Sequence, residues 1–116
     1  EFRRVLFRSD AHQPLYRIYH GWARFLCAEA ADIRTRNEAR EAIKQALTQD
    51  ESIDVGYLFM GHISKMLGND ELAERFYRKT LTLSPNNADA LRELRLLESR
   101  RRERGKDGLL NKIFKK

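Results

Sequence analysis

Cysteine, proline and long apolar segments are scarce in this chain of 116 residues, and each shortage excludes a class of protein. A single cysteine cannot form an internal disulfide, which predicts a reducing, cytoplasmic environment. No apolar run approaches the roughly 20 residues that a transmembrane helix needs. With only two prolines and abundant Ala, Leu, Arg, Glu and Lys, the composition favours helices. The sequence therefore predicts one all-α domain.

Motifs that would carry chemistry are also missing from the sequence. There is no Gly-rich phosphate loop, no GxSxG and no HExxH. The three histidines are isolated, with no cysteine or carboxylate at ligand spacing on the same helix face. We therefore expect a protein that is not an enzyme and that holds neither a cofactor nor a metal ion.

The first nine residues, EFRRVLFRS, resemble one reading frame of a common sequencing-library adapter. Segments of this origin are kept apart from reasoning about the fold. The chain also lacks an initiator methionine. We expect residues 1–9 to be an artefact, and the rest, from Asp10 on, to be the C-terminal piece of a longer protein.

The net charge of +6 is unevenly distributed along the chain. Residues 92–116 hold ten Lys/Arg and four Asp/Glu, whereas residues 10–91 hold ten Lys/Arg and twelve Asp/Glu. Residues 105–116 include four apolar side chains among lysines, so this segment could fold on an anionic membrane or a partner, or remain a flexible tail. Arginines 100–102 and 104 could contact nucleic acid, but no aromatic residues interleave with them, so a solvated helix end is the better interpretation.

Apolar residues recur every three or four positions, as they do on amphipathic helices. This spacing predicts helices over about 13–31, 36–48, 53–67 and 70–83. Asn86 or Asn87 can cap a fifth helix that carries apolar residues to Leu97 and charged ones to Arg104. Gly105 and Gly108 are expected to break the chain before the tail.

Residues 20–53 align with residues 54–87 at an offset of 34. At this offset Ala39 meets Ala73, Ile43 meets Tyr77, and Leu47 meets Leu81. A period of about 34 residues is that of the tetratricopeptide helix-turn-helix. The second unit carries residue types typical of that pattern: Tyr57, Met60, Gly61, Gly68, Ala73, Tyr77, Thr80 and Pro85.

The chain thus resembles the tetratricopeptide repeat family over about residues 20–104. In the first unit, Cys27 stands where the second has Gly61, which predicts a buried small residue between helices. The resemblance implies two helix pairs, over about 20–53 and 54–87, and a capping helix over 88–104. Together they would form a short right-handed solenoid spanning residues 10–104, followed by the tail.

In this family the first helix of each unit lines a groove that binds a peptide or a partner domain. The resemblance places the following residues in that groove: Gly21, Arg24, Ala28, Val55, Leu58, His62, Lys65, Arg92 and Leu96. It implies a protein–protein interaction module whose ligand is a protein, a peptide or an upstream domain of the same chain. A weaker similarity is to the C-terminal parts of bacterial multidomain proteins with an upstream J-domain, which would make the chain a co-chaperone accessory region.

Overall fold

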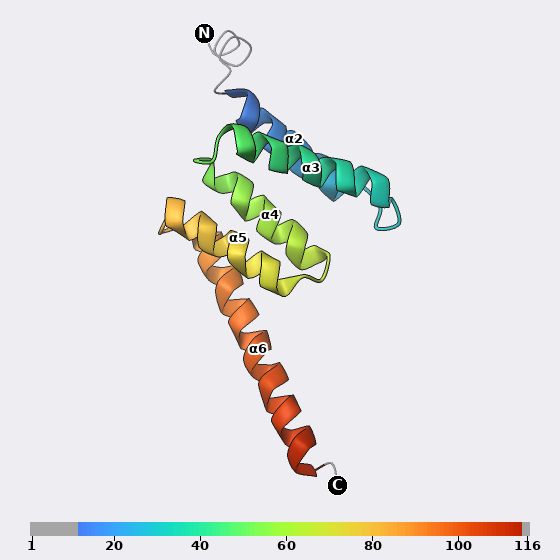
Figure 1. Ribbon diagram of the computed structural model, residues 1–116, viewed down its shortest axis with the longest axis vertical. Coiled ribbons are helices and arrows are strands. Elements are labelled where there is room, and N and C mark those ends of the chain that lie inside the picture. The colour runs from blue at the N-terminus through green and yellow to red at the C-terminus, as the bar shows by residue number, and fades with distance from the viewer. Residues whose placement is uncertain (1–11, 115–116) are drawn as a thin grey trace.

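The computed structural model describes residues 12–114, and this part of the chain is all-α. Its five helices are α2 (His12–Cys27), α3 (Ile33–Gln49), α4 (Asp54–Met66), α5 (Asp70–Leu83) and α6 (Ala88–Phe114) (Figure 1). No strand occurs among the described residues, so the all-α prediction is confirmed. Residues 1–9, predicted to be an artefact, lie outside the described residues.

Side chains at the helix starts and one glycine fix the boundaries between helices. Asp32, Asn69 and Asn87 each accept a hydrogen bond from the backbone N–H three residues later, at 3.1, 3.1 and 2.9 Å. Such caps satisfy N–H groups that a helix cannot bond internally. Gly68 has a φ of +84°, a conformation that favours glycine, and it reverses the chain between α4 and α5.

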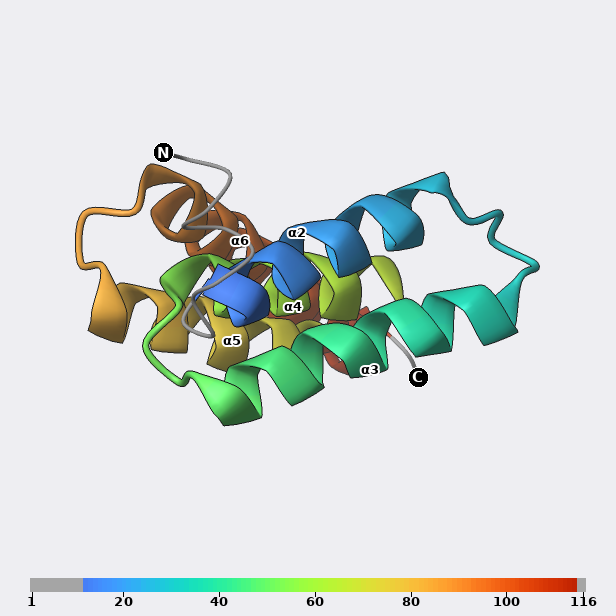
Figure 2. The same cartoon turned by 90° about the horizontal axis from the view of Figure 1, so that it is seen from above.

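Two hydrophobic clusters hold the helices together, and α4 contributes to both. One joins α2, α3 and α4 through buried Ile18, Phe25, Ala39, Ile43, Ala46, Leu47, Phe59, Met60 and Ile63. The other joins α4, α5 and α6 through buried Leu58, Ala73, Tyr77, Ala90 and Leu97. Each helix therefore packs mainly against its neighbours in the chain, as Figures 1 and 2 show.

The prediction that Cys27 is the small buried residue of the first helix pair is wrong, because Cys27 is exposed at the end of α2. Gly21 makes the close approach instead. A Cβ atom at Gly21 would lie 2.8 Å from Ile43, just as one at Gly61 would lie 2.6 Å from the ring of Tyr77. Gly21 and Gly61 are 40 positions apart in the sequence, whereas the residues that they approach, Ile43 and Tyr77, are 34 apart. The first helix pair is longer, because α3 has 17 residues and α5 has 14.

The predicted helix break at Gly105 and Gly108 is also wrong, because α6 continues through both glycines to Phe114. A glycine weakens a helix by about 1 kcal/mol relative to alanine but does not end it. The far end of α6 projects beyond the other helices (Figure 1). The radius of gyration, 17.6 Å, accordingly exceeds the roughly 13 Å expected of a compact chain of this length. None of the described helices is long and apolar enough to cross a membrane.

Candidate functional site

Apolar residues, some exposed and some buried against neighbouring helices, line one side of α2 and α4. On α2 this side consists of Leu15, Tyr19, Trp22 and Leu26, and on α4 of Val55, Phe59, His62 and Met66. Both sets follow spacings of four, three and four residues, which place them along one helix face. We call these eight residues the first-helix surface.

Ring contacts join the two halves of the first-helix surface. The ring of Trp22 stacks on Phe59 with centroids 4.9 Å apart, and Tyr19 meets Phe59 edge-on at 5.4 Å. Trp22 also lies 5.6 Å from the ring of His62. These ring contacts join α2 to α4 through their aromatic side chains.

Much of this surface is open to solvent. Leu26 is 53% exposed, Tyr19 52%, Met66 48% and Leu15 38%, whereas Phe59 is buried at 8%. Exposed large apolar side chains that gather in one place mark interaction sites more often than isolated ones do. Trp and Tyr are also the residue types that contribute most to binding at protein interfaces.

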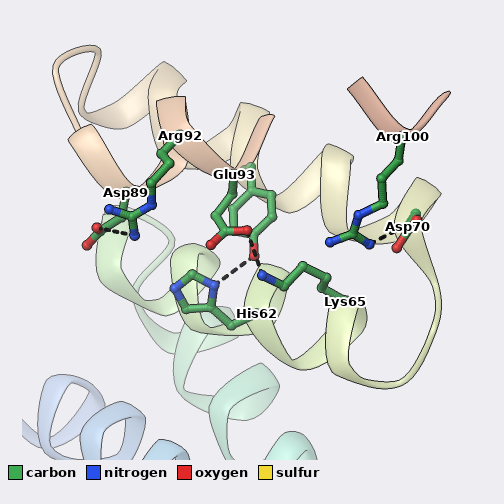
Figure 3. Close-up of polar contacts among 8 residues, drawn as sticks. His62, Lys65, Asp70, Asp89, Arg92, Glu93 and Arg100 are labelled. Carbon is green, nitrogen blue, oxygen red and sulfur yellow. Dashed lines mark hydrogen bonds and ion pairs between the residues drawn. The ribbon is translucent and has the colours of Figure 1, made fainter. Parts of the chain in front are cut away.

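Polar side chains of α4 and α6 contact one another beside His62 (Figure 3). Lys65 of α4 forms an ion pair at 2.6 Å with Glu93 of α6, whose carboxylate is almost fully buried. Beside them, Asp89 pairs with Arg92 at 2.9 Å. Charge on this side is therefore largely neutralised within the protein, and the pair between Lys65 and Glu93 fixes α6 on α4.

His62 connects the polar side chains of α4 and α6 to the core. Its Nδ1 atom lies 2.7 Å from the hydroxyl of Tyr77, a fully buried side chain of α5. Burial lowers the pKa of His62 below its ordinary 6.5, although the negative charge of Glu93 opposes this shift. Burial likewise raises the pKa of Tyr77. Both side chains are thus held in their neutral forms near neutral pH.

The residues that the sequence placed in a groove are divided between several environments. Val55 and His62 belong to the first-helix surface, and Arg92 and Leu96 are exposed on α6. Leu58 is buried in the second cluster, so its assignment to an open groove is wrong.

The other predicted groove residues are turned toward neighbouring helices or lie past the helix end. Lys65 is bound to Glu93 on α6, and Arg24 pairs with Glu38 of α3 at 3.3 Å. Gly21 is buried against Ile43. Ala28 follows the last residue of α2.

Sequence reasoning missed Leu15, Tyr19, Trp22, Leu26 and Met66 as surface residues. The corresponding residues of α2 and α4 are 40 positions apart in the sequence. Aligning the two units at a constant offset of 34 therefore paired residues that are six positions out of register. The repeated spacing of four, three and four in both helices was the signal that could have found them.

A second polar cluster lies where α6 crosses the start of α5. Asp70 pairs with Arg104 at 2.8 Å and with Arg100 at 3.6 Å, and Glu74 pairs with Arg101 at 2.8 Å. A cavity of about 410 Å³ lies among these side chains. The arginines that the sequence offered as a nucleic-acid contact therefore serve largely to hold α6 on α5.

These features define an all-α protein of consecutive helices with an exposed apolar surface on its first helices. Within residues 12–114, the structure groups no three His, Cys, Asp or Glu side chains in a way that could hold a metal ion. The arrangement is suited to binding another molecule by apolar contact.

Among curated proteins, the chain is similar to WspC, described as a probable biofilm formation methyltransferase of Pseudomonas aeruginosa. The two are 34% identical over 70 residues, which are 60% of this chain and 17% of the relative. The chain therefore spans less than a fifth of that relative's length. The similarity corrects the prediction that the protein is not an enzyme, because the relative is named as one. No family model matches the chain, and no solved structure matches it.

Proposed function

We propose that the chain is the helical docking part of a methyltransferase, and that its first-helix surface binds a protein or peptide partner in the cytoplasm. The observation that carries the proposal is the alignment of apolar and aromatic side chains on α2 and α4, of which Leu15, Tyr19, Leu26 and Met66 are exposed. The similarity to the Pseudomonas aeruginosa methyltransferase supplies the enzyme to which such a part would belong.

The tetratricopeptide resemblance supports this proposal from a second direction. Repeats of that family form binding surfaces on their first helices and rarely carry chemistry of their own. The close approaches at Gly21 and Gly61 are consistent with two such helix pairs, in which a glycine lets the paired helices pack tightly. Docking would bring a partner or an upstream domain to the methyl-transfer site. The co-chaperone interpretation stays a prediction.

An exchange experiment in Pseudomonas aeruginosa tests both parts of the proposal. The segment of the relative that matches this chain is replaced by the corresponding residues of this chain, and biofilm formation and methyl incorporation are measured. A strain with the segment deleted is the reference. We expect the exchanged segment to restore function. Failure to restore it would contradict the assignment to a methyltransferase.

Two variants of the exchanged segment separate docking from folding. Leu26→Ser and Met66→Ser remove apolar contact from the first-helix surface, and each is expected to reduce function at least tenfold. Ile33→Ser is the matched control, because Ile33 is 66% exposed at the start of α3, outside that surface. Equal activity of all three variants would contradict docking at the first-helix surface.

A further inference from the structure

The end of α6 extends beyond the point where the rest of the protein supports it. Among the side chains that the structure describes, the ion pairs from α6 to α5 end with that of Arg104 to Asp70, the first residue of α5. The ten residues from Gly105 to Phe114 add about 15 Å of helix past this point. Figure 1 shows this part of α6 projecting alone. A helix of this length gains little stability by itself in water.

Close packing does not explain why positions 105 and 108 are glycine. A Cβ atom at either position would meet nothing within 4 Å, unlike at Gly21 and Gly61, where a side chain lies in contact distance. Two such glycines make this segment easier to unfold than the preceding turns. This end of α6 would therefore gain helical stability when it binds a surface.

Charge distinguishes this segment from the rest of α6. Arg100, Arg101 and Arg104 pair with Asp70 and Glu74 of α5, which offset two of these three charges. Lys106 and Lys112 are exposed, and the sequence continues with Lys115 and Lys116, against Asp107 as the single acid. The excess positive charge that no acid of α5 offsets is thus concentrated after Arg104.

The apolar residues of the segment occur at helical spacing among these lysines. They are Leu109, Leu110, Ile113 and Phe114, separated by one, three and one positions. On a helix this pattern falls within less than half the circumference. Ile113 is 58% exposed. Basic residues combined with an apolar stripe are the combination that places a helix in the interface of an anionic bilayer.

We infer that the end of α6, from Gly105 to Phe114, is a reversible anchor for an anionic lipid surface. The lysines attract the segment to acidic headgroups, and the apolar stripe enters the boundary between headgroups and acyl chains. The bilayer stabilises the end of a helix that other helices do not support. One short segment, with four lysines within it or directly after it, gives weak attachment, so the anchor would position the protein at a membrane without fixing it there.

Vesicle sedimentation of the full chain tests this inference. We expect binding to vesicles of phosphatidylcholine with phosphatidylglycerol and none to phosphatidylcholine alone. Binding should fall about tenfold as the salt concentration rises from about 0.1 M to about 1 M, where the Debye length shrinks from ~10 to ~3 Å. A chain ending at Arg104 keeps the described ion pairs to α5 and should not bind. Circular dichroism is the control that the shortened chain is folded.

Point variants identify which property of the segment is responsible. Lys112→Glu and Ile113→Ser should each weaken vesicle binding several-fold. The matched controls Lys44→Glu and Ile33→Ser change exposed residues of α3 and should leave it unchanged. Replacing Gly105 and Gly108 by alanine should strengthen binding, because the bound form is helical. Loss of binding in that variant would overturn the helical anchor.

Two results would overturn the lipid assignment itself. One is equal vesicle binding by the full chain and the chain ending at Arg104. The other is salt-sensitive binding of the full chain to duplex DNA or RNA without binding to anionic vesicles, which would identify the segment as a nucleic-acid contact. Neither result bears on the first-helix surface, so the proposed docking function would stand or fall separately.

Discussion

Glycine has opposite roles at different positions of this chain, and the difference can be measured. Gly61→Ala would place a Cβ atom 2.6 Å from the ring of Tyr77, and Gly21→Ala would place one 2.8 Å from Ile43 and 3.0 Å from the carbonyl oxygen of Ala39. Tyr77 and Ile43 are completely buried, so a new Cβ atom would have to displace core side chains. Each substitution should therefore lower the free energy of unfolding by about 1–3 kcal/mol, measured by urea denaturation.

Gly108→Ala is the matched control for these substitutions. Its Cβ atom would meet nothing within 4 Å, so the higher helix propensity of alanine should raise helix content in the far part of α6. The free energy of unfolding should stay the same or rise by up to about 1 kcal/mol. If Gly21→Ala were as harmless as Gly108→Ala, the close approach between α2 and α3 would be disproved.

His62 makes the stability of the protein depend on pH in a predictable direction. Its pKa in the folded protein lies below the ordinary value of 6.5, so the unfolded chain binds a proton that the folded protein binds less readily. Stability is therefore fully present above about pH 6.5 and decreases as the pH falls from there toward the lowered pKa. We expect a lower melting temperature at pH 5 than at pH 7.5.

Comparison with His62→Gln isolates this contribution from the other titrating groups. Glutamine can still bond the hydroxyl of Tyr77 but does not titrate, so the difference in stability between the two proteins should shrink as the pH falls. The pKa values of Asp32 and Asp50 are lowered by hydrogen bonds from Thr35 and Ser52, and their effect appears at lower pH in both proteins. A difference that is constant with pH would contradict the lowered pKa of His62.

At the scale of helices, sequence patterns located the elements well and their register less well. The predicted helix 70–83 matches α5, whose cap at Asn69 and apolar periodicity are local signals. The predicted helix 36–48 began three residues too late, because Asp32 caps a helix that starts at Ile33, and the predicted helix 13–31 ran past the end of α2 at Cys27. Register between helices depends on which residues meet in space. Gly21 and Cys27 are both small, and a constant offset of 34 selected Cys27, because sequence alone does not reveal a longer helix pair.

The same distinction explains what was predictable about the candidate site. Val55 and His62 lie on the apolar side of α4, in the unit with the regular sequence pattern, and their contact with a partner stays a prediction. Leu58 was misplaced because its burial depends on the position of α6, which packs against it through Ala90 and Leu97. Local periodicity gives a helix its apolar face, but neighbouring helices decide how much of that face stays exposed.

The two halves of α6 differ in what they contribute to the fold. A chain shortened to Arg104 should melt within about 2 °C of the full chain, because the described contacts of α6 with α5 are kept. A chain shortened to Glu98 loses the pairs that Arg100, Arg101 and Arg104 form with α5, and it should melt several degrees lower. Equal destabilisation by both truncations, measured by thermal unfolding, would show that the projecting part also supports the core.

At the scale of the whole molecule, stability comes from contacts between neighbouring helices and not from one central core. The first cluster joins α2, α3 and α4, and the second joins α4, α5 and α6. In such an arrangement, stability is a sum of the helix pairs and the contacts between neighbours. Damage at one end should therefore weaken the nearest helices first.

Leu97→Ala tests this view, because Leu97 is 3% exposed and belongs to the second cluster alone. It should cost about 2–5 kcal/mol and speed amide hydrogen exchange in α5 and α6 far more than in α2 and α3. Phe25→Ala is the mirror experiment, since Phe25 lies in the first cluster, and it should speed exchange chiefly in α2 and α3. Helix α4 should respond to both variants, because it contributes Leu58 to one cluster and Met60 to the other. Uniform acceleration across all helices in both variants would instead reveal a single cooperative unit.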